Sequence, residues 1–222
     1  MNTTQVNLSN EAFFGKALKR NLNYALSKRC LDIAVAAIAL IMLLPLLTVV
    51  CLLVRLTARG KALYWQERVG LNGKVIRFPK IRSMVQGADS KIGLVKSKNK
   101  HKCSITFKMK RDPRVTFIGR FIRKFSIDEL PQLWLVLTGE LSLVGPRPAL
   151  VREVEKYSTY ERQRLLVKPG LTCIWQVSGR GDIAFKEQVN MDLAYISQRS
   201  LWVDLKLLLL TVPAVLAGKG AY

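Results

Sequence analysis

Residues 33–54 form a run of 22 positions without a single charged side chain. About 20 apolar residues in an α-helix reach across the hydrocarbon core of a bilayer, so this run is long enough to cross one. It begins too far from the N-terminus to be an ordinary secretory signal peptide. We therefore expect the chain to combine a membrane helix with a folded part outside the bilayer.

Two features of this run argue against a simple transmembrane span. Pro45 lies in its middle, where a proline removes a helix hydrogen bond and bends the helix. Lysine and arginine usually gather on the cytoplasmic side of a span, but here they flank both ends, at Lys28, Arg29, Arg55, Arg59 and Lys61. This pattern favours a re-entrant helix, which enters and leaves the bilayer on the same face. A straight span that tolerates its proline is the alternative, and sequence physics alone leaves both open.

The chain is strongly basic, with 36 lysines and arginines against 15 acidic residues and a formal net charge of +21. Half of its residues are hydrophobic, which argues against disorder over most of its length. A basic chain binds anions, and nucleic acid, anionic lipid and phosphorylated substrates compete for this role. The apolar run favours lipid and phosphorylated substrates.

The reactive side chains leave carboxylates as the available acids and bases. The single histidine, His101, lies in a lysine-rich stretch and gives no basis for a Ser-His-Asp triad. P-loop, dinucleotide-binding and H-E-x-x-H motifs are absent from the sequence. Neither a zinc site nor a disulfide framework is expected, because irregular spacing without a C-x-x-C pair separates Cys30, Cys51, Cys103 and Cys173.

Outside the membrane run, the sequence predicts an α+β fold that is mostly helical. A short β-hairpin is expected over 63–78, around the turn dipeptide Asn72-Gly73, and a basic loop over 91–110. Amphipathic or interfacial helices are expected around 117–122, 129–137, 152–166 and 201–216. We divide the chain into an N-terminal arm (1–27), a re-entrant membrane helix (28–58) and a catalytic domain with an interfacial C-terminal helix (59–222).

An adjacent acidic pair, Asp128-Glu129, follows a basic run and precedes an apolar stretch. A helix that starts at Glu129 with Asp128 as its cap places Pro131 where the missing N–H costs nothing. Both carboxylates then lie at a helix N-terminus, where the helix dipole favours anions. Capping is the ordinary role of such a pair, but beside arginines an ionised aspartate is also well placed to attack a phosphorus atom.

Arginines near this pair could hold a diphosphate, because a guanidinium group binds phosphate oxygens bidentately. Arg147 is fixed between two prolines, and Arg123 lies five residues before Asp128. Arg123 alone could equally be a solvated or lipid-facing charge. Arg147 in its rigid turn is harder to explain without a ligand.

Six motifs of this chain follow the order found in the bacterial sugar transferases, the monotopic phosphoglycosyl transferases, which the chain resembles from residue 28 to residue 222. They are KR-x-x-D at 28–32, QERVG at 66–70, KIRSM at 80–84, DPRVT at 112–116, SIDELPQLWLVLTGELSLVGPRP at 126–148 and KPGLT at 168–172. Ile81, Leu135, Glu140 and Cys173 depart from the residues usual in the family. These departures concern local contacts rather than the reaction.

The resemblance implies an enzyme that moves a sugar-1-phosphate from a UDP-sugar to undecaprenyl phosphate and releases UMP. The family's aspartate nucleophile corresponds to Asp128, which would form a covalent phosphosugar intermediate, while Glu129 assists through Mg²⁺ or a proton. Asp128 and Glu129 are therefore also the expected metal ligands. The expected substrate-binding residues are Lys80, Arg82, Arg123, Arg147, Arg180, Asp192 and Asp204.

The resemblance also implies a location at the cytoplasmic face of a bacterial inner membrane, in contact with the lipid bilayer. The reaction would be the first membrane step of exopolysaccharide synthesis, with galactose or glucose as the favoured sugar. No nucleic-acid partner is expected, and a homodimer is left open. The rival interpretation is a membrane-tethered module that binds nucleic acid or anionic lipid through residues 91–124, where 12 lysines and arginines accompany one acid, Asp112.

Overall fold

A computed structural model describes residues 22–57, 60–88, 90, 105, 109, 112–218 and 220. The expected N-terminal arm up to residue 21, most of the basic loop at 91–110, His101 and Cys103 lie outside this range. The helices are α2 (Leu22–Thr57), η1 (Leu71–Gly73), α4 (Phe117–Lys124), η3 (Ile127–Gln132), α5 (Leu133–Thr138), α6 (Val151–Val154), α7 (Thr159–Arg162), η4 (Gln163–Leu166), α8 (Ile174–Ser178), η5 (Arg180–Asp182), α9 (Phe185–Gln198) and α10 (Leu201–Ala217). The strands are β1 (Leu63–Val69), β2 (Val75–Ile81), β3 (Ser142–Val144), β4 (Ala149–Leu150) and β5 (Gly170–Thr172).

Two small sheets lie among these helices, so the expected α+β class is confirmed. The first sheet is antiparallel in the order β2-β1-β4, and the second pairs β3 with β5 in parallel. The predicted hairpin forms, with Val69 opposite Val75 at its closed end. Asn72 (φ 53°) and Gly73 (φ 83°) adopt the left-handed conformation that such a turn requires.

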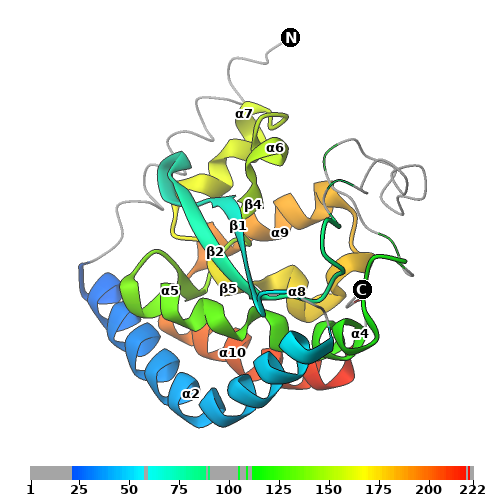
Figure 1. The fold of residues 1–222 in the computed structure, drawn as a ribbon. Coiled ribbons are helices and arrows are strands. Elements are labelled where there is room, and N and C mark those ends of the chain that lie inside the picture. Colours follow the sequence, from blue (N-terminus) through cyan, green and yellow to red (C-terminus); the bar gives the residue numbers. More distant parts are fainter. Residues whose placement is uncertain are drawn as a thin grey trace.

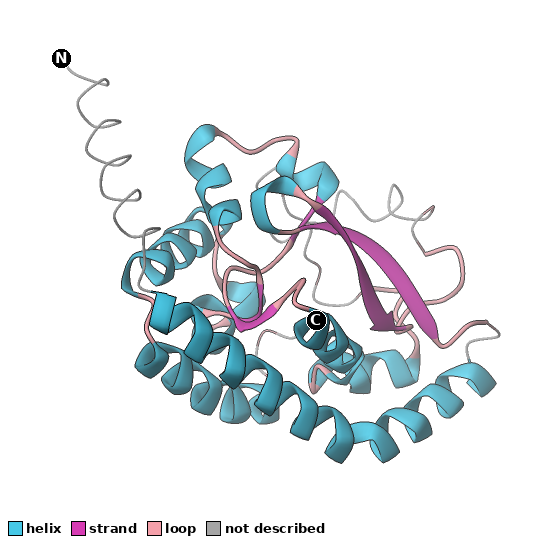
Figure 2. Cartoon of the chain, turned by 90° about the vertical axis from the view of Figure 1, so that its left-hand side faces the viewer, coloured by secondary structure: helices cyan, strands magenta, loops and turns pink. Residues whose placement is uncertain are grey.

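The long helix α2 curves beneath the rest of the molecule, and both of its ends turn back toward it (Figures 1 and 2). Pro45 lies inside the helix, which accounts for a bend because proline cannot donate the backbone hydrogen bond. Within the described ranges, α2 is the one helix long and apolar enough to cross a membrane, judged by length and composition. It begins at Leu22, earlier than the expected start at Lys28.

Three helices present large apolar side chains to the outside. Met42 of α2 is 74% exposed, Phe117 of α4 is 84% exposed and Trp202 of α10 is 76% exposed. Apolar exposure on this scale is rare on a soluble surface and marks a contact with membrane or partner. Together with the length of α2, it fits the expected association with a lipid bilayer.

Specific polar contacts fix the start of α2 to the body of the molecule. The Arg29 guanidinium donates to the carbonyl oxygens of Val136 (2.6 Å) and Leu137 (2.7 Å), which belong to the last turn of α5. The Val136 carbonyl also accepts the backbone N–H of Gly139 at 3.2 Å, and a cation at these last-turn carbonyls complements the helix dipole. Asp32 accepts the backbone N–H of Leu143 at 3.1 Å and so ties α2 to β3.

The helices at 117–122 and 201–216 are found as α4 and α10, but the single helix expected over 152–166 is wrong. That segment forms three short helices, α6, α7 and η4. Ser158 interrupts it, because its side chain accepts the backbone N–H of Glu161 while the Glu161 side chain accepts the N–H of Ser158. This capping box starts a new helix in the middle of the charged stretch.

Candidate active site

A cavity of about 450 Å³ lies between the β-hairpin, η3, the turn before β4, and the segment from α8 to η5. Its wall carries many more cations than anions. The cations are Arg68, Lys80, Arg82, Arg114, Arg123, Arg147, Arg152, Arg164 and Arg180, and the anions are Asp112, Asp128, Glu129 and Glu153. Such a wall favours a ligand that carries several negative charges, such as a diphosphate.

The acidic pair lies in the first turn of η3, although not as predicted. The helix does not begin at Glu129 with Asp128 as its cap. It is a 3-10 helix that begins at Ile127, and the preceding Ser126 makes no side-chain cap bond. The tighter 3-10 turn accommodates Pro131, and the α-helical part begins only at Leu133. Both carboxylates nevertheless reach the cavity wall.

Glu129 is held by two cations. Its Oε1 accepts from Lys80 Nζ at 2.8 Å and from Arg147 Nη2, and its Oε2 accepts from Arg147 Nη1 at 3.1 Å. Burial raises the pKa of this carboxyl, but Arg147 and Lys80 outweigh it and hold the pKa well below its usual value. Glu129 is therefore ionised, and both of its oxygens are engaged.

Asp128 differs from its neighbour, because none of the described residues forms an ion pair with it. The residue is only 6% exposed and lines the cavity. Burial raises the pKa of the Asp128 carboxyl. The charge of Lys80 lowers this pKa, and the charge of Glu129 raises it further. A buried carboxylate without an ion pair to the described residues has lone pairs that no cation among them holds, which is what a nucleophile needs.

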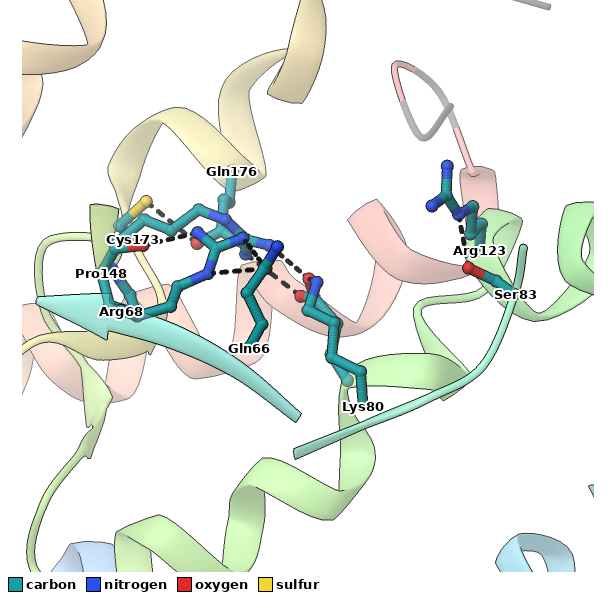
Figure 3. Close-up of polar contacts among 10 residues, drawn as sticks. Gln66, Arg68, Lys80, Ser83, Arg123, Pro148, Cys173 and Gln176 are labelled. Carbon is teal, nitrogen blue, oxygen red and sulfur yellow. Dashed lines mark hydrogen bonds and ion pairs between the residues drawn. The ribbon is translucent and has the colours of Figure 1, made fainter. Parts of the chain in front are cut away.

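Arg147 and Arg123 approach the acidic pair from different elements. Arg147 comes from the turn before β4, and Glu129 raises its pKa against the effect of burial. Arg123 comes from α4, and its Nε donates to Ser83 Oγ at 2.8 Å. In Figure 3, Arg123 and Ser83 lie apart from the group around Arg68. Arg147 and Arg123 both line the cavity.

The structure also brings Arg82 and Arg180 to the cavity wall. Arg82 Nε donates to the carbonyl oxygen of Lys61 at 2.8 Å. Arg180 has a φ of 52°, and its Nη1 is buried without a hydrogen-bond partner among the described residues. Ser126 beside the acidic pair has a φ of 53°. Left-handed backbone at residues other than glycine costs free energy and tends to occur at functional sites.

Asp192 and Asp204 do not line the cavity, so the structure does not bring them together with the other expected substrate-binding residues. Both side chains are fully buried, and each forms an ion pair with a lysine or arginine of the protein. Asp192 forms an ion pair with Arg164, which does line the cavity. Asp204 of α10 accepts from Lys28 Nζ at 2.9 Å and from Tyr195 Oη at 2.7 Å. These carboxylates neutralise buried cations and join helices.

The known sequences that this chain matches agree with the geometry. The profile of the family described as bacterial sugar transferase matches residues 23–218. The chain belongs to the bacterial sugar transferase family. This match confirms the resemblance that the six motifs indicated.

Three relatives of this family member are informative. It is 45% identical to "Galactosyl transferase CpsE" of Streptococcus agalactiae serotype III over 202 residues. This aligned region covers 90% of this chain and 44% of the relative. It is 41% identical to "Undecaprenyl-phosphate galactose phosphotransferase" of Salmonella typhimurium, over 88% of this chain and 41% of the relative. It is 38% identical to "Exopolysaccharide production protein ExoY" of Sinorhizobium fredii, over 89% of this chain and 88% of the relative. The chain thus spans less than half the length of the first two.

Arg68 is a cavity residue that the sequence interpretation missed. Its Nη1 donates to the carbonyl oxygen of Pro148 at 2.6 Å, and its Nε and Nη2 donate to Gln66 Oε1 (Figure 3). Burial and the nearby charge of Arg147 lower the pKa of Arg68 to about 10. Arg68 therefore braces the turn that carries Arg147. The motif QERVG contains it, but the partner at Pro148 is too distant in sequence to infer.

The acidic pair also bears on the expected Mg²⁺. No group of three His, Cys, Asp or Glu side chains that could hold a metal occurs in the described part of the chain. Magnesium is often bound by one or two carboxylates together with substrate phosphates and water. Asp128 fits that donor set, whereas Glu129 could join it only after losing a cation.

Proposed function

We propose that this chain transfers a sugar-1-phosphate from a UDP-sugar to undecaprenyl phosphate and releases UMP. The observation that carries the proposal is a buried aspartate, Asp128, without an ion-pair partner among the described residues, in a cavity rich in arginine and lysine. That combination suits covalent attack on a phosphoryl group, because the cations offset the charge that develops on the phosphate oxygens. The names of the relatives support the donor and acceptor classes.

In the proposed first step, an Asp128 carboxylate oxygen attacks the phosphorus atom that carries the sugar. A P–O bond forms to Asp128, and the P–O bond to the bridging oxygen breaks, so UMP leaves with the bonding electrons. In the second step, an oxygen of undecaprenyl phosphate attacks the same phosphorus and displaces the Asp128 carboxylate. The product is the diphosphate-linked sugar. Because an acyl phosphate is a reactive mixed anhydride, one difficult transfer becomes two easier ones.

The surrounding residues would orient the donor and offset its charge. Arg147 and Lys80 lie beside the acidic pair and are suited to the diphosphate, Arg147 as a bidentate fork and Lys80 as a point charge. Arg123, Arg82 and Arg180 are placed to contact other parts of the substrates. Mg²⁺, bound by Asp128 together with the diphosphate, would supply further charge neutralisation.

The apolar surface of α2, α4 and α10 gives the proposal a location. One substrate is aqueous and the other lives in the bilayer, so a site beside a half-inserted helix can reach both. We place the reaction at the cytoplasmic face of a bacterial inner membrane, as the first membrane step of exopolysaccharide synthesis. Galactose or glucose is the favoured sugar, as the names of the relatives suggest.

The identity of the released nucleotide tests this proposal. Purified full-length protein, undecaprenyl phosphate and Mg²⁺ are incubated with a set of UDP-sugars, and the products are separated by chromatography. Release of UMP is expected, because the bond that breaks lies between the two phosphates. Release of UDP would instead indicate an ordinary glycosyltransferase, and no release with any UDP-sugar would favour the rival role of a membrane-tethered anion-binding module.

A further inference from the structure

The ion pairs of Glu129 are more accessible than the other ion pairs in the described part of the chain. The side chains of Lys80 and Glu129 are 18% and 15% exposed, and those of Arg147 and Glu129 are 21% and 15% exposed. By contrast, the Arg164–Asp192 pair is 5% and 0% exposed, and the Arg114–Asp112 pair is 7% on both sides. Lys80, Arg147 and Glu129 all line the cavity. A ligand in the cavity can therefore reach this cluster.

Lys80 and Arg147 form an anion-binding site, and the anion bound there is the Glu129 carboxylate of the same chain. Arg147 grips the Glu129 carboxylate through both of its terminal nitrogens, and Lys80 adds a third donor. A phosphate presents oxygen pairs to a guanidinium in the same bidentate manner as a carboxylate does. Two cations share a single carboxylate here, so the cluster keeps an excess of positive charge.

We propose that Glu129 is an internal substitute for a substrate phosphate, and that a nucleoside diphosphate, on binding, replaces Glu129 as the partner of Lys80 and Arg147. This inference deepens the proposed function and rests on it for the class of ligand. A phosphate carries more charge and more acceptor oxygens than a carboxylate, so it can win this exchange. Glu129, once released, has free oxygens beside Asp128. Release would let it serve as a base or metal ligand only when substrate is bound.

This exchange predicts that removing the charge of Glu129 strengthens the binding of UDP instead of weakening it. In wild-type protein the ligand has to displace Glu129, and this competition weakens binding. Glu129→Gln keeps the shape of the side chain but removes the competing charge. The variant should therefore bind UDP about tenfold more tightly than wild type, which corresponds to about 1.4 kcal/mol. A residue that only binds substrate or metal would give weaker binding when removed.

A matched control is available at Glu153. This glutamate also lines the cavity, but its side chain accepts the backbone N–H of Leu150 rather than a bond from Lys80 or Arg147. Glu153→Gln changes the charge of the cavity by the same amount and leaves the Glu129 cluster intact. Its affinity for UDP should stay within about twofold of wild type.

The experiment measures UDP, UMP and uridine binding to full-length protein in detergent by calorimetry, with a chelator present so that metal does not contribute. Tighter binding of UDP and UMP by Glu129→Gln, without a change for uridine, is the expected result. Glu129→Ala serves as a second variant, and thermal unfolding confirms that each variant is folded. Equal or weaker UDP binding by both Glu129 variants, or equal tightening in Glu153→Gln, would overturn the proposal. If wild-type protein releases UMP but the Glu129 variants do not bind UDP more tightly, the proposed function stands and this inference alone is rejected.

Discussion

At the scale of single residues, two adjacent carboxylates have opposite properties because their neighbours differ. Lys80 and Arg147 hold the pKa of Glu129 well below its usual value, whereas burial raises the pKa of Asp128. Neighbouring acids whose pKa values are driven apart are typical of sites where the two groups have different roles. Asp128 is suited to attack, and Glu129 to a supporting role.

Replacing Arg147 with lysine tests whether the guanidinium fork matters rather than its charge. Arg147→Lys keeps one positive charge but cannot contact two oxygens in parallel. We expect kcat/KM to fall at least about tenfold, the equivalent of one charge-assisted contact of about 1.4 kcal/mol. The measurement is the initial rate of UMP release at several UDP-sugar concentrations.

The control for this variant is Arg77→Lys. Arg77 is an exposed residue of the hairpin and does not line the cavity, so its replacement should leave the rate unchanged. An Arg147→Lys protein as active as Arg77→Lys would show that Arg147 does not bind phosphate in the way proposed.

The sequence singled out residues that the structure brings together in one cavity, but it did not show their partners. The pair Asp128-Glu129 and Arg147 were recognisable from neighbours within a few positions. Asp192 and Asp204 were expected to bind substrate because they match the family. Their partners in the structure are distant in sequence, Arg164 by 28 residues and Lys28 by 176 residues. A buried ion pair and a ligand contact look alike in a sequence, since only the fold shows which cation is near.

At the scale of elements, the segments that were predicted correctly carry local signals. The hairpin depends on Asn72-Gly73. Helix α5 ends at Thr138, one residue beyond the expected end at Leu137, and Gly139 after it adopts a φ of 90°. The segment at 152–166 was misread because its charged pattern is continuous while Ser158 starts a new helix within it. The 3-10 form of η3 was missed because the pattern of apolar residues does not distinguish it from an α-helix.

A prediction at the scale of elements concerns whether both ends of α2 lie on the same side of the membrane. We expect a re-entrant helix, because Pro45 bends α2 and both ends of the helix turn toward the body of the molecule (Figure 1). Single cysteines are introduced near Asn10 and near Gly60 in a background without native cysteines, and intact cells are treated with an impermeant thiol reagent. Both sites should stay protected until the cells are permeabilised.

The same assay applied to Pro45→Ala tests the cause of the bend. The variant should straighten α2 and shift some molecules toward a spanning topology, with labelling of the Asn10 site and a parallel loss of activity. Labelling of the Asn10 site in the parent protein, before any change at Pro45, would show a straight span and contradict the re-entrant topology.

At the scale of the whole molecule, one buried carboxylate joins the beginning of the described chain to its end. Asp204 of α10 accepts from Tyr24 and Lys28 of α2 and from Tyr195 of α9. Arg29 connects α2 to α5 in the same region. These contacts fix the membrane helix relative to the domain that carries Asp128. The Asp128 carboxylate is thereby held at a set position relative to the apolar helix α2.

Asp204→Ala should destabilise the fold without touching the cavity. The variant leaves Lys28 without its anion, and breaking a buried ion pair typically costs about 3–5 kcal/mol. For a domain of this size we expect the unfolding temperature in detergent to fall by about 6–20 °C. Glu67→Ala, at an exposed position of the hairpin, is the control and should change it little. An unfolding temperature equal to that of the control would mean that Asp204 does not secure α2.

The proposed reaction requires Asp128 to become covalently bonded to the phosphosugar. Wild-type protein and Asp128→Asn are each mixed with a UDP-sugar labelled in the phosphate next to the sugar, with Mg²⁺ and without undecaprenyl phosphate. Intact-protein mass spectrometry then measures any adduct, and chromatography measures UMP. We predict that wild-type protein gains the mass of one sugar phosphate and releases UMP, while folded Asp128→Asn does neither. Near-normal UMP release by folded Asp128→Asn would contradict the account.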